Sequence, residues 1–273
     1  MAEGDTVFAT AVRLHEALAG RVLTRTDFRV PAFATADLSG QVIEEVVSRG
    51  KHLLVRTGGG TSVHSHLGMD GAWRLYEPGE RWRGRSFEVR GVLETDRRIA
   101  VGHRLRRLEV LRTAAESNVL GHLGPDVLGP DWDEDEAVAR LTASEERPVG
   151  EALMDQRVMA GPGNVYRSEV SFLAGIDPRA PVGEVEDPVI LIRLMKSLME
   201  RNRSGGRRVT TDDPRAGREL WVYGLACRPC RRCGTPIRSF TQSLGTRGGL
   251  GTQGGPGASR ITYWCPGCQD SLG

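Results

Sequence analysis

The first 226 residues of this 273-residue chain contain no cysteine. All five cysteines lie beyond that point, which argues against a disulfide framework and favours a metal site in a reducing compartment. Long apolar runs are absent too, because no stretch approaches the roughly 18 residues that a membrane-spanning helix needs. The acidic start, with Glu3 and Asp5, does not resemble a signal peptide. We therefore expect a cytoplasmic protein with no membrane partner.

Lysine is scarce, since Lys51 and Lys196 are the only two and arginine supplies the rest of the basic charge. Arginine binds phosphate with a planar, bidentate guanidinium, so nucleic acid is an admissible partner. The net charge is only +2, and charge alone does not demand such a partner. With 39% hydrophobic residues the chain can bury a sizeable core, and its length predicts roughly two domains.

Hydrophobic spacing divides the chain into regions of different secondary structure. Apolar residues at helical spacing predict a helix over residues 5–19, and short β-rich runs with glycine turns predict an antiparallel sandwich up to about residue 111. A glycine- and proline-rich segment follows, and the pattern after it is helical. The expected fold is multidomain α+β, with an N-terminal domain 1–122, a linker 123–134, a helical domain 135–222 and a cysteine-containing domain 223–273.

Individual elements follow from the same patterns. The expected strands are 42–47, 52–56, 61–66, 73–76, 87–93 and 108–111, and the expected helices are 137–141, 149–159, 165–174 and 189–201. Asn164 follows Gly161-Pro162-Gly163 and is predicted to cap the third of these helices, which leaves a helix N-terminus for an anion. An ordinary tight turn between two helices explains the same residues equally well.

The first residues place an amine, a carboxylate and a helix start close together. Removal of Met1, which the small Ala2 permits, would leave an α-amino group with a reference pKa of about 7.7–8.0. A sizeable fraction of such an amine is neutral at cellular pH, whereas a lysine, at about 10.4, is almost wholly protonated. Glu3 is a candidate proton shuttle beside it. The alternative is a solvated terminus with an ordinary Asp5 helix cap.

The turn His66-Leu67-Gly68-Met69-Asp70-Gly71 lies between two expected strands. An exposed methionine there either packs beneath a loop or wedges between nucleic-acid bases. His66, taken alone, is best explained as a surface histidine at a strand end.

Two C-x-x-C pairs close to the C-terminus predict one structural zinc site between two knuckles, with Cys230, Cys233, Cys265 and Cys268 as ligands. Cys227 is a rival ligand, because it forms a further C-x-x-C with Cys230. The segment 245–257 between the knuckles is rich in glycine and should be disordered. A β-rich run at 260–264 predicts a hairpin that displays Arg260 near its turn.

Four segments, in this order, resemble the formamidopyrimidine-DNA glycosylase and endonuclease VIII family of base-excision repair enzymes. Glu-Gly-Asp-Thr-Val at 3–7 is similar to the endonuclease VIII branch, and Arg-Gly-Lys-His-Leu-Leu at 49–54 to the hairpin that holds the family's essential lysine. Residues 153–169, ending Gly-Pro-Gly-Asn-Val-Tyr-Arg-Ser-Glu, resemble its helix–two-turn–helix element. Residues 221–269 resemble its zinc finger.

The resemblance implies a monomeric DNA glycosylase and AP lyase that acts on damaged double-stranded DNA at the nucleoid. It implies that Ala2 attacks the sugar C1′ to form a Schiff base, that Glu3 moves protons, and that β/δ-elimination then cleaves the strand. Further roles follow from the same resemblance: the sugar is positioned by Glu169, the space left by the flipped base is filled by Met69, and the phosphates are held by Lys51, Asn164, Arg260 and His66.

Two positions depart from the family's pattern. Ala2 stands where the family has proline, which leaves open a lyase-impaired enzyme or a non-catalytic binder of damaged DNA. Retention of Glu3 and Lys51 favours an active enzyme. Leu108 follows Arg106-Arg107 where the oxidised-purine branch has an aromatic residue, so oxidised pyrimidines are the expected substrates and an oxidised-purine glycosylase is the alternative.

Overall fold

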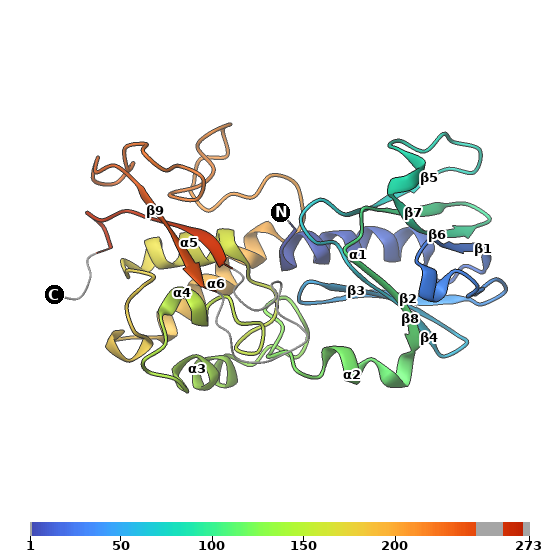
Figure 1. Ribbon diagram of the computed structural model, residues 1–273, viewed down its shortest axis with the longest axis horizontal. Helices are drawn as coiled ribbons and strands as arrows, with labels where there is room; N and C mark the ends of the chain where they lie inside the picture. The colour runs from blue at the N-terminus through green and yellow to red at the C-terminus, as the bar shows by residue number, and fades with distance from the viewer. Residues whose placement is uncertain (1, 244–258, 270–273) are drawn as a thin grey trace. The chain divides into compact units, whose positions relative to one another are not determined.

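The computed structural model describes residues 2–243 and 259–269. The chain divides into two compact units, Met1–Gly121 and His122–Gly273 (Figure 1). Each unit has a hydrophobic core of its own. The finer division into linker, helical and zinc-finger domains stays a prediction, and the glycine-rich segment 245–257 lies outside the described residues.

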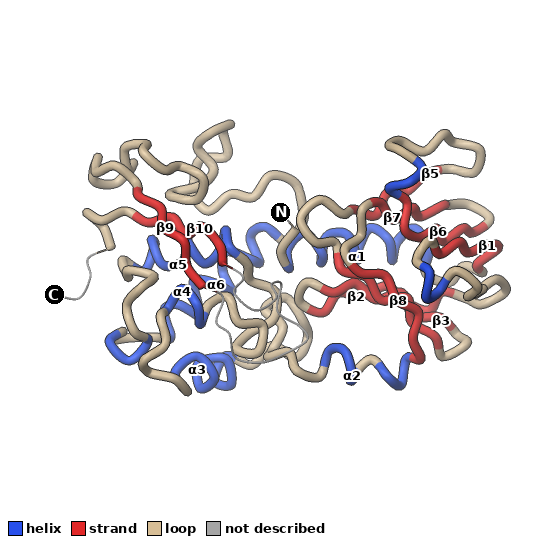
Figure 2. Tube along the Cα trace, in the orientation of Figure 1, coloured by secondary structure: helices blue, strands red, loops and turns tan. Residues whose placement is uncertain are grey.

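Unit 1 begins with helix α1 (Gly4–Leu18), which is followed by two four-stranded antiparallel sheets (Figures 1 and 2). One sheet has the strand order β1-β6-β7-β5, and the other has the order β2-β3-β4-β8. The strands are β1 (Leu23–Phe28), β2 (Ile43–Arg49), β3 (His52–Thr57), β4 (Thr61–His66), β5 (Ala72–Tyr76), β6 (Val89–Thr95), β7 (Ile99–His103) and β8 (Arg107–Arg112). The connections include helix α2 (Ser117–Leu120) and 3-10 turns at Pro31–Phe33, Ser86–Glu88 and Thr113–Ala115.

The core of unit 1 joins the two sheets and α1. Leu14 and Leu18 of the helix pack in one buried cluster with residues such as Leu53 and Leu93, which come from different sheets. Within this core the indole N–H of Trp73 donates to Ser65 Oγ at 3.0 Å, a bond between the two sheets. The predicted antiparallel sandwich is confirmed.

Two strands of the sandwich were not predicted. Only the end residues of β1 are buried, so its sequence carries little alternation. All five residues of β7 are buried, and Gly102 interrupts its apolar run. A Cβ at Gly102 would lie only 2.5 Å from the side chain of Leu105, so glycine is required at this position. Because glycine weakens strands in general, the sequence pattern did not indicate a strand here.

Unit 2 is mainly helical. Its elements are α3 (Glu134–Thr142), α4 (Val149–Ala152), α5 (Asn164–Ala174), a 3-10 turn (Val182–Glu184), α6 (Val189–Asn202) and a hairpin of β9 (Arg238–Ser243) and β10 (Ser259–Trp264). The helix expected over 149–159 was wrong beyond Ala152. Asp155 accepts the backbone N–H of Arg157 at 2.9 Å, and the Gln156 amide donates to the carbonyl of Met154 at 3.0 Å, so side chains replace the helical bonds there.

No helix in the parts of the chain that the structure describes combines the length and the apolar character needed to cross a membrane.

Candidate functional site

The N-terminal segment of unit 1 is held by packing. Ala2 is only 9% exposed and belongs to the apolar core cluster, and Glu3 is fully buried. Glu3 is the N-cap of α1, and its backbone carbonyl accepts the N–H of Val7 at 3.1 Å. Asp5 lies inside the first turn, where its carboxylate accepts the N–H of Thr6 at 2.7 Å. The alternative of a solvated terminus with an Asp5 cap was therefore wrong.

Lys51 lies in the two-residue turn between β2 and β3, and Gly50 beside it adopts a left-handed φ of 56°. This turn points toward the N-terminal half of α1. Near the other end of the helix, Gly20 N–H donates to Ile43 O at 2.8 Å, so β2 starts at the C-terminus of α1 and runs back along it. The sandwich therefore carries Lys51 toward the end of the helix that holds Glu3.

Strand register brings Lys51 to the same sheet edge as the methionine turn. His52 of β3 pairs with His66 of β4, and His66 pairs with Arg107 of β8. The residues just outside these pairs, Lys51 and Arg106 among them, therefore lie at one end of the sheet. Burial, followed by the charges of Lys51 and Arg106, lowers the pKa of His66 to about 4.

His66 is a structural part of the turn. Its side chain is buried, and its Nδ1 accepts the backbone N–H of Gly68 at 3.0 Å, which requires a neutral ring. The interpretation of His66 as a surface histidine was therefore wrong. Gly71 N–H closes the same turn by donating to Leu67 O at 3.1 Å.

Met69 is presented to solvent by this turn, with 60% of its surface exposed. It does not pack beneath a loop, as one of the two alternatives required. Gly68 has a φ of 73°, and a Cβ there would approach the Cβ of Arg106 to 2.9 Å, so the turn is built against the neighbouring segment 104–106. An exposed apolar side chain on a turn with internal hydrogen bonds is suited to insertion between stacked bases.

A chain of hydrogen bonds behind Lys51 was not predicted. His52 Nδ1 lies 2.8 Å from His64 Nε2, and His64 Nδ1 lies 3.1 Å from a carboxylate oxygen of Glu109. Burial lowers the pKa of His64 despite this carboxylate. These hydrogen bonds fix the side chain of His52, the residue after Lys51, inside the sheet. The sequence signal was the alternation of His64 and His66 opposite His52 across the predicted hairpin.

Titration of His66 should make the stability of unit 1 depend on pH. Its pKa is about 4 in the folded protein and about 6.5 in the unfolded chain. The contribution of His66 to the free energy of unfolding is therefore complete above pH 6.5 and is lost as pH falls toward 4. The expected contribution is about 2 kcal/mol between pH 7 and pH 5. Urea unfolding of wild type and His66→Asn at both pH values measures it. Asparagine keeps an acceptor but does not titrate, so an equal pH dependence in the two proteins would contradict this account.

In unit 2, α5 packs against β10 through its first residue. The N-cap is Gly163, so the prediction that Asn164 caps this helix was wrong. The Asn164 amide instead donates to Ile261 O at 2.9 Å, and its oxygen accepts a hydrogen bond from the Arg167 guanidinium. These bonds place Asn164 beside the strand that carries Arg260, where Arg260 pairs with Gln242.

Glu169 of α5 is fully buried and accepts four hydrogen bonds. Three come from consecutive backbone N–H groups, those of Trp221, Val222 and Tyr223, at 2.8–2.9 Å, and the fourth comes from the hydroxyl of Thr210. Burial raises the pKa of Glu169, and these donors oppose the shift. Both carboxylate oxygens are therefore used to fix the segment 221–223 on the helix.

The two cysteine knuckles meet. The sulfur atoms of Cys230, Cys233, Cys265 and Cys268 all lie within 4.8 Å of one another, and Cys227 is not part of the cluster. Four thiolates around a tetrahedral Zn²⁺ at 2.3 Å stand about 3.8 Å apart, so the four residues fit such an ion. Hydrogen bonds from Thr235 lower the pKa of Cys233 to about 6, while burial raises the pKa of Cys265 to about 11.

Comparison with known proteins places the chain in a family. Residues 1–109 match the formamidopyrimidine-DNA glycosylase N-terminal domain, and residues 123–206 match the formamidopyrimidine-DNA glycosylase H2TH domain. The chain is 52% identical to a probable endonuclease 8 2 of Streptomyces coelicolor, over 98% of this chain and 94% of the relative. The chain belongs to the formamidopyrimidine-DNA glycosylase and endonuclease VIII family.

Two further similarities agree. The DNA-(apurinic or apyrimidinic site) lyase Nei2 of Mycolicibacterium smegmatis is 49% identical, over 98% of this chain and 99% of that protein. A crystal structure of the Lactococcus lactis formamidopyrimidine-DNA glycosylase bound to DNA with an AP site superposes with a TM-score of 0.77 at 22% identity, covering 98% of this chain and all of that one. This structural superposition establishes the fold.

Proposed function

We propose that the terminal amine of Ala2 is the nucleophile through which this chain, a DNA glycosylase and AP lyase of base excision repair, removes damaged bases. The observation that carries the proposal is the packing of Ala2 into the core beside a fully buried Glu3, because it holds in place the two residues that bear the amine and the carboxylate. Attack of the amine on C1′ expels the base and forms a Schiff base, and elimination then cleaves the strand. Glu3 transfers the protons that these steps require.

Oxidised pyrimidines are the proposed substrates. Leu108, at the position where the oxidised-purine branch carries an aromatic residue, is buried in the core of unit 1 and presents no ring to DNA. Strand cleavage of duplexes that contain thymine glycol, dihydrouracil or 8-oxoguanine tests this choice. The proposal requires faster cleavage at the two pyrimidines, and preference for 8-oxoguanine would reverse it.

The proposed DNA contacts come from both units. In unit 1, Met69 inserts into the base stack and Lys51 binds a phosphate. The buried His66 side chain stabilises the turn that carries Met69. In unit 2, Asn164 and Arg260 lie on adjoining elements, α5 and β10, and bind phosphates. Glu169 acts as a positioning residue, because its carboxylate holds the segment 221–223. The protein is proposed to act as a monomer at the nucleoid.

The four-cysteine cluster is proposed to bind one structural zinc ion per chain. Purified Cys227→Ser should retain the metal, because Cys227 stands outside the cluster, whereas Cys233→Ser should lose most of it. Elemental analysis of the two variants beside wild type measures the effect. Zinc lost from Cys227→Ser and kept by Cys233→Ser would overturn the ligand set.

A further inference from the structure

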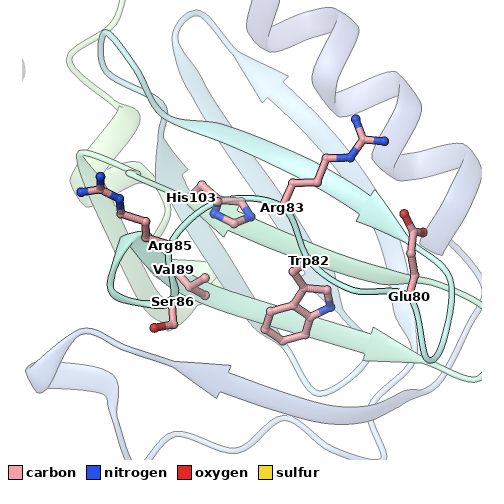
Figure 3. Close-up of a pocket in the computed structure, with 8 residues that line it drawn as sticks. Glu80, Trp82, Arg83, Arg85, Ser86, Val89 and His103 are labelled. Carbon is pink, nitrogen blue, oxygen red and sulfur yellow. The ribbon is translucent and has the colours of Figure 1, made fainter.

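The loop between β5 and β6 is fixed to the sandwich and lines an open cavity of about 360 Å³ (Figure 3). The backbone N–H of Arg83 donates to the hydroxyl of Tyr76 at 3.1 Å, and the Arg29 guanidinium donates to Ser86 O at 3.1 Å. These bonds attach both halves of the loop to strands or their ends. The cavity wall is therefore held in place by the strands.

His103, the last residue of β7, forms the cavity floor. Its side chain is 4% exposed, and neither ring nitrogen has a hydrogen-bond partner among the described residues. Burial lowers the pKa of His103, so the ring is neutral and offers one donor and one acceptor. A buried polar ring without a protein partner destabilises the fold, and a ligand that hydrogen-bonds to the ring removes that cost.

The other walls have the composition of a nucleotide site. Figure 3 shows the Trp82 indole below His103, with the side chains of Arg83 and Arg85 extending to opposite sides. Neither Arg83 nor Arg85 forms an ion pair with any residue in the described ranges. Arginines interleaved with aromatic rings bind unpaired nucleotides, because the rings stack on bases and the guanidinium groups bind phosphates. The donor and acceptor of a neutral histidine match a base edge better than an anion.

A short segment connects the wall of this cavity to the turn that carries the exposed methionine. Arg104, which follows His103 with a left-handed φ of 50°, donates its backbone N–H to Glu88 O at 2.7 Å. On the other side, Arg106 N–H donates to His66 O at 2.9 Å. The segment 104–106 therefore joins the loop that covers the cavity to the turn that presents Met69.

We propose that this cavity binds the unpaired base that stands opposite the lesion, with its ring against Trp82 and its edge on His103. The proposal rests on the proposed role of Met69, because a side chain inserted in the stack leaves that base without a partner. Arg83 and Arg85 bind the phosphates on either side of it. The nearest unpaired base to a Met69 wedge, once the lesion is flipped, is the base opposite.

Photo-crosslinking tests the proposal with a duplex that carries a tetrahydrofuran abasic analogue opposite 5-iodouracil. The expected crosslink maps to Trp82 and disappears in Trp82→Ala. Trp82→Ala should also weaken binding of the analogue duplex by about 5- to 100-fold, the range expected for one stacked base. That loss should vanish when the opposite position carries a second tetrahydrofuran, since no base is then present to stack.

Matched variants separate the cavity from the rest of the loop. Arg81→Ala removes an exposed arginine that does not line the cavity. This variant should keep the crosslink to Trp82 and the tighter binding of the duplex that has a base opposite the abasic analogue. Wild type should bind the duplex that has a base opposite the abasic analogue more tightly than the duplex that has a second tetrahydrofuran there. His103→Leu should abolish this difference in affinity, and His103→Gln should keep part of it. A crosslink outside the cavity, or equal losses on both duplexes, would overturn the proposal. Cleavage at thymine glycol by the same wild-type preparation tests the proposed function separately.

Discussion

One additional residue ahead of Ala2 should abolish covalent trapping of the enzyme on damaged DNA. Such an extension converts the terminal amine into an amide, which is no longer nucleophilic, while the buried Ala2 side chain and Glu3 stay in the sequence. Borohydride reduction during incubation with an AP-site duplex, followed by denaturing electrophoresis, measures the trapped adduct. A fall of at least about 100-fold is expected, as is usual when a covalent nucleophile is lost.

The control is the same extension placed at the C-terminus, which should leave trapping unchanged. Ala2→Pro, with Met1 removed, should increase strand cleavage, because a secondary amine passes directly to the charged iminium whereas a primary amine first forms a Schiff base that must be protonated. Normal trapping by the N-terminally extended protein would remove Ala2 from the mechanism.

Glu169→Gln should destabilise unit 2 by about 3 kcal/mol. The carboxylate accepts bonds from three consecutive backbone N–H groups and a hydroxyl, and an amide turns one of its two acceptors into a donor that faces other donors. Urea unfolding monitored by tryptophan fluorescence measures the loss. The exposed Glu186→Gln in the same unit is the control and should change stability by less than about 0.5 kcal/mol.

The kinetic consequence distinguishes positioning from direct participation. If Glu169 acts by holding the segment 221–223, Glu169→Gln should regain strand-cleavage activity at a temperature low enough for the variant to stay folded. Thr210→Ala, which removes one of the four donors, should show a smaller loss of stability and of activity than Glu169→Gln. A variant as stable as wild type but inactive would instead assign Glu169 to contact with the sugar.

The β3–β4 hairpin was predictable from the sequence. Two short β-rich runs, His52–Thr57 and Thr61–His66, flank the turn Gly58-Gly59-Gly60, and the tight turn fixes the register that pairs His52 with His66. The hydrogen bond between His52 and His64 is a consequence of that register. No single residue predicts it, because it depends on how the two strands pair.

Other features depend on contacts that no local pattern encodes. The expected helix 149–159 failed because the Asp155 and Gln156 side chains bond the backbone in its place, and propensity does not register that competition. The Asn164 cap failed because its partner is Ile261, 97 residues away along the chain. The partners of Glu169 lie 41 to 54 residues away along the chain. Such pairs become visible only once the fold has brought them together.

The amine of Ala2, and not the side chain of Lys51, is proposed to attack the sugar. A lysine with the reference pKa of about 10.4 is neutral in only about one molecule in a thousand near pH 7.5, so a terminal amine has the advantage. Proteolysis of the borohydride-reduced adduct and mass spectrometry of the DNA-linked peptide test this most directly. The modified peptide is expected to begin at Ala2. A modified peptide that contains Lys51 would contradict it.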